Sequence, residues 1–263
     1  MVRGIFFAKR YLLLVEITLA ILCGLGIGAV LGYVGAGGSM LAVPALIYIF
    51  GLSPVQATTA SLLVVFVGAA SGVLPKLKRN EILLREALII WSIGLVTNLS
   101  GAYFLPRIPE NLVLTGFALV LVAAGVSMLV PSPSGSSEKK ISPVALVVIS
   151  LVIGALTGLF GIGGGFLAIP ILILFYGVAP ARAAGTSLFI IAINTLTGFF
   201  AHYRHWDEVN WLIPIIMAST ALIVSRLASH HSSKLSPATL KRAFALFVFS
   251  ISIFTLIDTW IIS

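Results

Sequence analysis

Long apolar stretches, separated by short polar or glycine-rich segments, follow one another along the whole chain. Eight of them approach or reach the roughly 20 residues that an α-helix needs to cross a bilayer, and most contain no charged residue: Leu12–Leu31, Val55–Leu74, Ala87–Leu105, Leu112–Val130, Ile141–Phe160, Ala183–Ala201, Val209–Ser225 and Ala243–Ile262. The pattern predicts an all-α, polytopic helical membrane protein with about eight full transmembrane helices.

Two further apolar stretches are too short to cross a membrane. Ser39–Phe50 and Gly165–Tyr176 are followed by turns that contain glycine and proline, at residues 51–54 and 177–180. Twelve helical residues rise about 18 Å, whereas a bilayer core is about 30 Å thick. Backbone that is not helical at membrane depth is tolerated only where it is buried in protein or lines a cavity. We therefore expect two re-entrant half-helices.

The two short stretches belong to an internal repeat. Residues 32–62 and 158–188 align without gaps and share 14 of 31 positions. A polar segment rich in proline and serine, residues 131–140, lies near the middle of the chain and has the composition of a solvated linker. The sequence thus predicts an N-terminal transmembrane repeat over residues 1–130, a linker over 131–140, and a C-terminal transmembrane repeat over 141–263.

Composition supports a membrane protein, but the charges do not fix its orientation. The 263 residues are 59% hydrophobic and only 9% charged, whereas soluble domains carry about 25% charged residues. The net charge of +8 comes largely from basic clusters interpreted as loops: Arg3, Lys9, Arg10, Lys76, Lys78, Arg79, Arg85, Lys139 and Lys140. Such clusters report topology and contact with anionic membrane lipids; a soluble basic face for nucleic acid is absent. Parallel repeats place ten Lys and Arg inside and six outside, and inverted repeats place eleven and five, so both remain open.

The glycine-rich breaks are the first candidate binding site for an anion. Each break opens a short helix, and a helix N-terminus offers free N–H groups and a partial positive charge. The alternative is close packing of helices through small residues. Paired glycine-interrupted segments in corresponding halves favour a binding site. Its predicted members are Gly35, Gly37, Gly38 and Ser39 in the first copy, and Gly161, Gly163, Gly164 and Gly165 in the second.

Polar residues that follow the two turns are the second set of candidates. Their hydroxyls, amides and one guanidinium suit the oxygens of a small anion, although the same groups also cap helices or bond between them. The set comprises Gln56, Thr59, Ser61, Arg182, Thr186, Ser187 and Asn194. Ionisable residues within the spans are candidates for proton coupling or interfacial anchors: Glu16, Arg182, Arg226 and Asp258.

Two histidine-containing segments are assigned to the membrane interface. Residues 202–208 combine histidine, tyrosine, tryptophan and charged residues just after an apolar span, which is typical of an interfacial belt; His230 and His231 are interpreted as a polar loop. No histidine spacing matches a metal motif, and neither a hydrolase elbow nor a P-loop occurs. With Cys23 as the single cysteine, no disulfide, metal site, cofactor or enzymatic activity is expected.

The duplicated phrases resemble the TauE/SafE family of sulfite exporters and 4-toluene sulfonate uptake permeases. The residues that carry the resemblance are Gly35-Ala36-Gly37-Gly38 through Pro44, Gly161-Ile162-Gly163-Gly164-Gly165 through Pro170, Ala184-Gly185-Thr186-Ser187, and the turn leading to Asp207. The resemblance implies a multi-pass transporter in the cytoplasmic (inner) membrane of a prokaryote. It also implies a small sulfur-containing or organic anion as substrate, with proton coupling.

The functional prediction is a secondary active transporter of small anions. Sulfite, sulfoacetate or another organosulfonate is the expected substrate, with protons as the expected coupling ion. A passive anion channel and an uptake permease for small carboxylates are the alternatives. The sequence leaves the direction of transport, the side of the N-terminus and homo-oligomer formation open.

Overall fold

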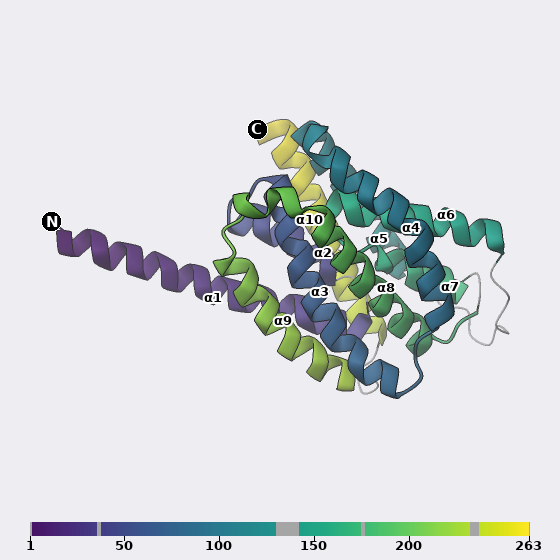
Figure 1. Ribbon diagram of the computed structural model, residues 1–263. Helices are drawn as coiled ribbons and strands as arrows, with labels where there is room; N and C mark the ends of the chain where they lie inside the picture. The colour runs from purple at the N-terminus through teal and green to yellow at the C-terminus, as the bar shows by residue number, and fades with distance from the viewer. Residues whose placement is uncertain (1, 36–37, 130–141, 175–176, 232–236, 263) are drawn as a thin grey trace.

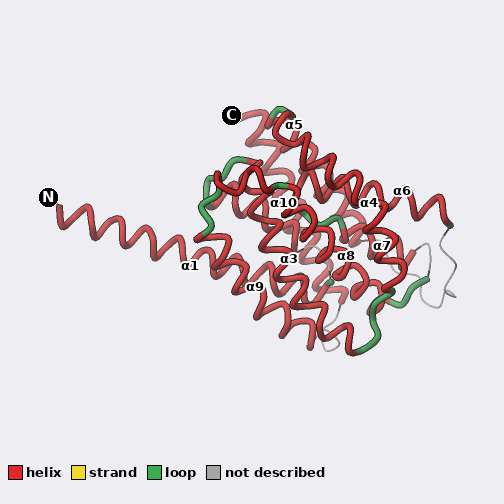
Figure 2. Tube along the Cα trace, viewed as in Figure 1, coloured by secondary structure: helices red, strands yellow, loops and turns green. Residues whose placement is uncertain are grey.

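The chain is helical throughout the part that the structure describes. The computed structural model describes residues 2–35, 38–129, 142–174, 177–231 and 237–262, and these residues contain helices and turns but no strand (Figure 2). The all-α prediction is therefore confirmed.

Ten α-helices lie in these residues, and short π- and 3₁₀-helical segments extend or connect four of them (Figure 1). The α-helices are α1 (Val2–Val34), α2 (Gly38–Pro44), α3 (Pro54–Lys78), α4 (Leu84–Phe104), α5 (Glu110–Leu129), α6 (Pro143–Phe160), α7 (Gly165–Leu174), α8 (Pro180–Ala201), α9 (Leu212–His231) and α10 (Pro237–Ile257). The short segments are η1 (Ala45–Ile49), η2 (Leu105–Arg107), η3 (Tyr203–Glu208) and η5 (Asp258–Ile262).

Six helices in the described part of the chain are apolar and long enough to cross a membrane. They are Leu12–Val34, Pro54–Lys78, Leu84–Arg107, Pro143–Phe160, Pro180–Ala201 and Leu212–His231. The other two expected crossings contain shorter apolar stretches, Glu110–Val126 and Val248–Ile261. Large apolar side chains such as Val96 and Leu119 are exposed on the outside of the bundle, as a lipid-facing surface requires. The chain is a multi-pass membrane protein.

The two short apolar stretches form short helices with matching ends. The first continues from α2 into the π-helix η1, which begins directly after Pro44; proline lacks the N–H that a regular α-helix needs in its interior. Both stretches are followed by a glycine in the left-handed αL conformation, whose N–H donates to the carbonyl four residues earlier. Gly51 N–H donates to Ile47 O and Leu52 N–H to Leu46 O; Gly177 and Val178 repeat the pattern with Ile173 and Leu172. Because Gly51 and Gly177 have φ of 68° and 64°, a side chain at either position would be strained.

Helices α3 and α8 occupy the centre of the bundle and run antiparallel. Leu62 near the start of α3 lies against Gly198 near the end of α8, while Gly72 lies against Leu188. Most of the α3 and α8 spans is buried, whereas only 22% of the α1 span is buried. The N-terminal turns of α1 project beyond the bundle (Figure 1).

Two parallel helix pairs flank the centre and are held by close glycine contacts. α1 lies against α9, where Gly24 meets Met217 and Gly32 meets Ala228. α4 lies against α6, where Gly94 meets Ser150 and Gly158 meets Asn98. Small residues allow helix backbones to approach closely. α5 packs with α10, where Ser252 Oγ donates to Ala118 O.

Six basic residues assigned to loops lie in helices instead: Arg3, Lys9 and Arg10 in α1, Lys76 and Lys78 in α3, and Arg85 in α4. Lys76 belongs to α3, is 2% exposed, and its Nζ lies 3.5 Å from Glu81 Oε2. The loop assignment of Lys76 is wrong because α3 continues for one turn beyond the apolar span. The proposed linker, residues 131–140, lies outside the described residues.

Candidate functional site

Each glycine-rich break contacts a helix of the other repeat: the first break contacts α8, which follows the short helix α7, and the second contacts α3, which follows the short helix α2. Gly35 lies against Ala184 of α8, and Gly161 lies against Thr58 and Ser61 of α3. Ser61 Oγ donates to Thr58 O at 2.8 Å and lies 3.4 Å from Gly161 O. Both glycines have positive φ, 77° and 66°. The fold therefore brings the break of one half onto the polar helix start of the other.

The remaining glycines of the second break are packed tightly between helices. A methyl group at Gly163 would lie 2.8 Å from Ile191 Cγ2, and a methyl group at Gly164 would lie 2.5 Å from Ile153 O. Gly165 is in contact with Ser187, whose Oγ donates to Gly165 O at 2.6 Å. In the first break, Gly38 lies against Ile27 and Leu31 of α1, Gly37 lies outside the described residues, and the side chain of Ser39 is not described.

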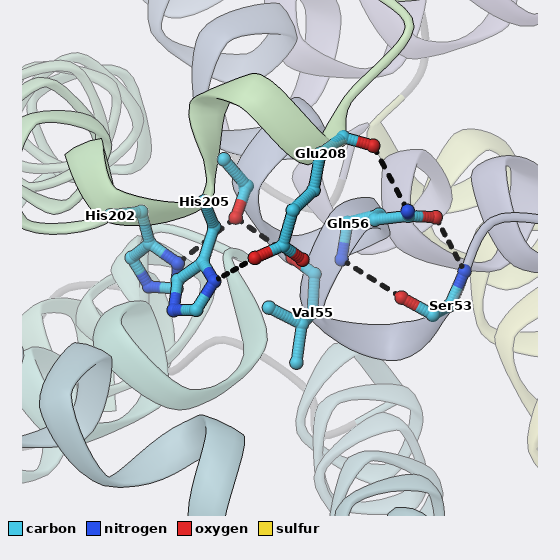
Figure 3. A network of polar contacts seen from close by, with 7 residues as sticks. Ser53, Val55, Gln56, His202, His205 and Glu208 are labelled. Atoms are coloured by element: carbon cyan, nitrogen blue, oxygen red, sulfur yellow. Dashed lines mark hydrogen bonds and ion pairs between the residues drawn. The ribbon is translucent and has the colours of Figure 1, made fainter.

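Two of the predicted polar residues, Gln56 and Thr186, form hydrogen bonds at the starts of helices, and a third lies in the first turn of α8. Gln56 forms a capping box with Ser53 at the start of α3, and its Nε2 donates to Glu208 O at 3.0 Å (Figure 3). Thr186 Oγ1 accepts from Leu83 N at 2.9 Å and donates to Arg182 O. Arg182 is half-buried in the first turn of α8. These residues lie at the two ends of the central helices, away from one another.

A group of polar residues from four helices is buried in the interior. We call Thr59, Ser61, Asn98, Thr157, Asn194 and His202 the buried polar cluster; each is 0% exposed. Gly198 marks its centre, because Leu62, Asn98 and Thr157 all reach the space over its Cα. α3, α4 and α6 thus converge on α8 at this glycine.

The cluster contains side-chain amide atoms without a partner. Asn98 Nδ2 donates to Asn194 O at 3.0 Å and lies 3.2 Å from Thr197 Oγ1. Asn98 Oδ1 and both side-chain polar atoms of Asn194 are buried and make no hydrogen bond. Burying an amide without a partner costs about 1–3 kcal/mol. An unpaired donor and acceptors at this depth are groups that a bound ligand or water would satisfy.

His202 joins the cluster across the helix crossing, which overturns its assignment to an interfacial belt. Its Nδ1 lies 3.1 Å from Thr59 Oγ1, and its Nε2 lies 3.2 Å from Gly158 O. Burial lowers the pKa of His202 to about 4, although the hydrogen bond to the Gly158 carbonyl opposes the shift. The belt assignment fails because α8 ends at Ala201 and the chain turns inward at His202, toward α3 and α6.

The partners of His202 assign its tautomer. Gly158 O can only accept, so Nε2 carries the proton and the neutral Nδ1 accepts from the Thr59 hydroxyl. Thr59 Oγ1 also lies 2.8 Å from Val55 O. If His202 gains a proton, Nδ1 becomes a donor to Thr59, and the hydroxyl turns to donate to Val55 O. The site therefore accepts a proton without losing a hydrogen bond.

The neighbours of His202 lie at or near the surface of the bundle. Tyr203 and Arg204 are exposed, and His205 Nδ1 lies 2.8 Å from Glu208 Oε1 (Figure 3). Trp206 stacks on Phe199 with ring centroids 4.5 Å apart.

A basic pocket of about 520 Å³ opens beside this segment. We call it the α8-end pocket. It is lined by Arg107, Arg204 and His205 together with Tyr103, Phe200 and Ala201. Ala201 and Tyr203, on either side of His202, both line it. Arg107 and Arg204 give this pocket a positive electrostatic potential.

A larger cavity, of about 570 Å³, lies between α1, α2 with η1, and α10. Its lining is almost wholly apolar, with Leu22, Ile27 and Phe254 as typical members. Such a lining offers an anion no compensation for its lost hydration, so this cavity is not the candidate site.

Sequence reasoning named some members of the cluster and missed others. Thr59, Ser61 and Asn194 were candidates, and Gly161 lies beside Ser61. Asn98 and Thr157 were not named, and His202 was assigned to the membrane interface. Asn98 carried a usable signal, because a polar residue inside an apolar span is costly and is a functional candidate by default.

A bundle of apolar helices around a buried polar cluster is the architecture of a multi-pass membrane protein with an internal site. The sulfite exporter TauE/SafE family matches residues 20–255, and the chain belongs to this family. A probable membrane transporter protein of Xylella fastidiosa (strain Temecula1) is 29% identical over 242 residues, which cover 89% of this chain and 92% of that protein. The probable membrane transporter protein YunE of Bacillus subtilis (strain 168) is 26% identical over 249 residues, covering 85% and 91%.

No solved structure matches the chain significantly. Family and relatives together identify the protein as a membrane transporter.

Proposed function

We propose that the protein is a secondary active transporter of small anions. The observation that carries the proposal is the buried polar cluster with its unpaired amide groups on Asn98 and Asn194. In transporters, substrate sites lie near the middle of the membrane beside interrupted helices. Gly198, around which the cluster gathers, lies beside the crossing of α3 with α8, and the Gly161 break is in contact with Ser61.

The proposed substrate is sulfite, sulfoacetate or another organosulfonate. The Asn194 amide nitrogen is an unpaired donor, and the hydroxyls of Thr59 and Ser61 can turn from backbone carbonyls to an oxyanion. These groups carry no charge, so release is not opposed by a strong buried ion pair. The family's name as sulfite exporters supports the sulfur oxyanion class. The glycine N–H groups of the two breaks and Arg182, Thr186 and Ser187 remain proposed contributors.

Proton coupling is assigned to His202. Among the described residues, His202 and Lys76 are the ionisable side chains with almost no exposure, and Lys76 already faces Glu81. An anion bound in the cluster would favour the imidazolium form of His202. Protonation and anion binding would then stabilise each other, which is the thermodynamic form of coupling.

The proposed location is the cytoplasmic (inner) membrane of a prokaryote. Relatives from Xylella fastidiosa and Bacillus subtilis support a prokaryotic context. The basic interfacial residues would contact anionic lipids rather than nucleic acid. Whether the transporter works as a monomer or as a homo-oligomer is a question for the purified protein.

The test is transport by the purified chain in proteoliposomes. We expect saturable uptake of radiolabelled sulfite or sulfoacetate that an imposed pH gradient accelerates, together with counterflow when the vesicles are preloaded with unlabelled anion. Anion flux that does not change with the pH gradient and shows no counterflow would indicate a channel. Saturable uptake of acetate or malonate, with no effect of the sulfur anions, would indicate a carboxylate permease.

A further inference from the structure

A second basic pocket lies at the end of α3, in the first repeat. Its position is equivalent to that of the α8-end pocket in the second repeat. This α3-end pocket has a volume of about 510 Å³ and is lined by Leu74, Pro75, Lys78, Arg226, Leu227 and His230. The repeat aligns residues 32–62 with 158–188, a shift of 126 positions. The same shift carries Leu74, Pro75 and Lys78 of one pocket onto Phe200, Ala201 and Arg204 of the other.

Several contacts between the two halves occur twice, once in each direction, when residues 126 positions apart are treated as equivalent. In each case a residue of the first half contacts a residue of the second half, and the two residues at the equivalent repeat positions are also in contact. Three such pairs of contacts are Gly72–Leu188 with Gly198–Leu62, Gly35–Ala184 with Gly161–Thr58, and Gly32–Ala228 with Gly158–Ala102. This exchange is what a two-fold relation between the halves produces.

The antiparallel course of α3 and α8 makes the relation an inverted one. Thr59, near the start of α3, meets His202, just past the end of α8, so the C-terminal ends of these helices lie at opposite ends of the bundle. The two pockets are formed at those C-terminal ends. Since both helices span the membrane, the pockets open toward opposite faces.

The interior beneath the two pockets is also equivalent. Gly198 faces Asn98 Oδ1, and the equivalent Gly72 faces Ser225 Oγ; both polar atoms are buried and unpaired. Closer to the pockets, His202 and Lys76 occupy equivalent positions of the repeat, and both side chains are buried. Each pocket thus lies over a polar interior at the crossing of α3 with α8.

We infer that the two pockets are the two mouths of one anion pathway, one on each membrane face. The inference rests on the proposed transport of small anions. The ligand is a small oxyanion, because three basic residues gather at each mouth: Arg107, Arg204 and His205 at one, and Lys78, Arg226 and His230 at the other. The described lining residues of both mouths include no acidic side chain. The crossing of α3 with α8 lies between the mouths.

Labelling of single cysteines tests the placement independently of transport. In a Cys23→Ser background, Lys78→Cys and Arg204→Cys are matched, because both residues are exposed and equivalent in the repeat. Each variant is treated with a membrane-impermeant, charged methanethiosulfonate in right-side-out and in inside-out vesicles. We expect one cysteine to react only from one face and the other only from the opposite face. Reaction of both from the same face would overturn the inference, whatever the transport activity.

Side-specific kinetics test the pathway itself. We expect Arg204→Gln to raise the KM for sulfoacetate about two- to fivefold at one face only, and Lys78→Gln to do so at the other, since one exposed charge contributes little. Arg85→Gln, an exposed arginine outside both pockets, is the matched control and should change neither KM. Unchanged KM values in both pocket variants would overturn the inference even if labelling is two-sided. If no anion is transported by the wild type, the proposed function fails, and labelling still reports the faces of the pockets.

Discussion

The Thr59 hydroxyl and the His202 imidazole lie 3.1 Å apart, although 143 positions separate them in the sequence. The contact joins the start of α3 to the end of α8 and places an ionisable side chain in the interior. Because Thr59 Oγ1 also reaches Val55 O at 2.8 Å, the hydroxyl can serve either protonation state of the ring. A single helix crossing thus creates a buried proton acceptor beside an uncharged polar cluster.

The stability of the protein should fall in acid because of His202. Its pKa is about 4 in the folded protein and about 6.5 in an unfolded chain. Between these values the unfolded state binds more protons, so stability is fully present above pH 6.5 and is lost as the pH falls toward 4. Between pH 7.5 and 4.5 the loss from this group is about 2.5 kcal/mol.

Thermal unfolding in detergent, followed by tryptophan fluorescence, measures the effect. His202→Gln should show a smaller loss of Tm between the two pH values than the wild type, because it lacks the titrating group. His230→Gln changes an exposed histidine at the end of α9, outside the buried polar cluster, and should behave as the wild type. An equal acid loss in His202→Gln and the wild type would contradict the prediction.

Substitutions at Asn194 and Asn98 should have different effects on substrate transport and on the stability of the fold. The side-chain amide of Asn194 has no partner in the protein, so Asn194→Leu should leave the unfolding free energy unchanged or raise it. If the amide binds substrate, the same change should lower transport at least tenfold. Asn98 Nδ2 is bonded to Asn194 O, so Asn98→Leu should destabilise the protein by about 1–3 kcal/mol.

Chemical unfolding and sulfoacetate uptake, measured on the same preparations, check this pair. A stable Asn194→Leu variant with wild-type transport would remove Asn194 from the proposed site.

The contact of α4 with α6 should tolerate no added methyl group. Gly154 faces the carbonyl oxygen of Gly94 at a separation that leaves no room for a Cβ. Gly154→Ala must push the helices apart, which we expect to cost about 3 kcal/mol or more. Gly26 is the matched control, since no other group lies within 4 Å of the position that a Cβ would take there. Gly26→Ala should stabilise α1 by about 0.5–1 kcal/mol.

Size-exclusion chromatography and thermal unfolding of the two alanine variants give the comparison. Equal behaviour of both variants would show that the α4–α6 contact is looser than the structure has it.

The burial of the charged Lys76 side chain should be tolerated only because Glu81 lies beside it. The two side chains lie 3.5 Å apart, and Lys76 is almost fully buried while Glu81 is partly exposed. Glu81→Gln leaves a buried ammonium without its partner, which should cost about 3 kcal/mol. Lys76→Met with Glu81→Gln should recover most of the loss, because an apolar side chain replaces the charge. A double-mutant cycle on unfolding free energies measures the coupling, and a coupling near zero would contradict the assignment.

Part of the candidate site could be read from the sequence and part could not. Thr59, Ser61 and Asn194 were found because they follow the turns of the duplicated segments or interrupt an apolar span. Asn98 and His202 were missed, since their partners lie 96 and 99 positions away for Asn98 and 44 and 143 positions away for His202. Asn98 interrupts an apolar span and so carried a signal in the sequence, whereas the sequence around His202 resembles an ordinary interfacial segment, and only the neighbouring helices reveal the burial of His202.

The sequence by itself determined the class of the protein. Its apolar stretches exceed what a soluble core can hold, its duplicated glycine phrases mark the breaks at Gly35 and Gly161, and those phrases carry the family resemblance. What only the tertiary structure decided is which residues meet. The crossing of α3 with α8 brings His202 onto Thr59, removes Lys76 from solvent, and sets the two basic pockets at opposite ends of the bundle. The physical reason is that hydrophobicity fixes which segments enter the membrane, whereas helix packing fixes which polar faces turn toward one another.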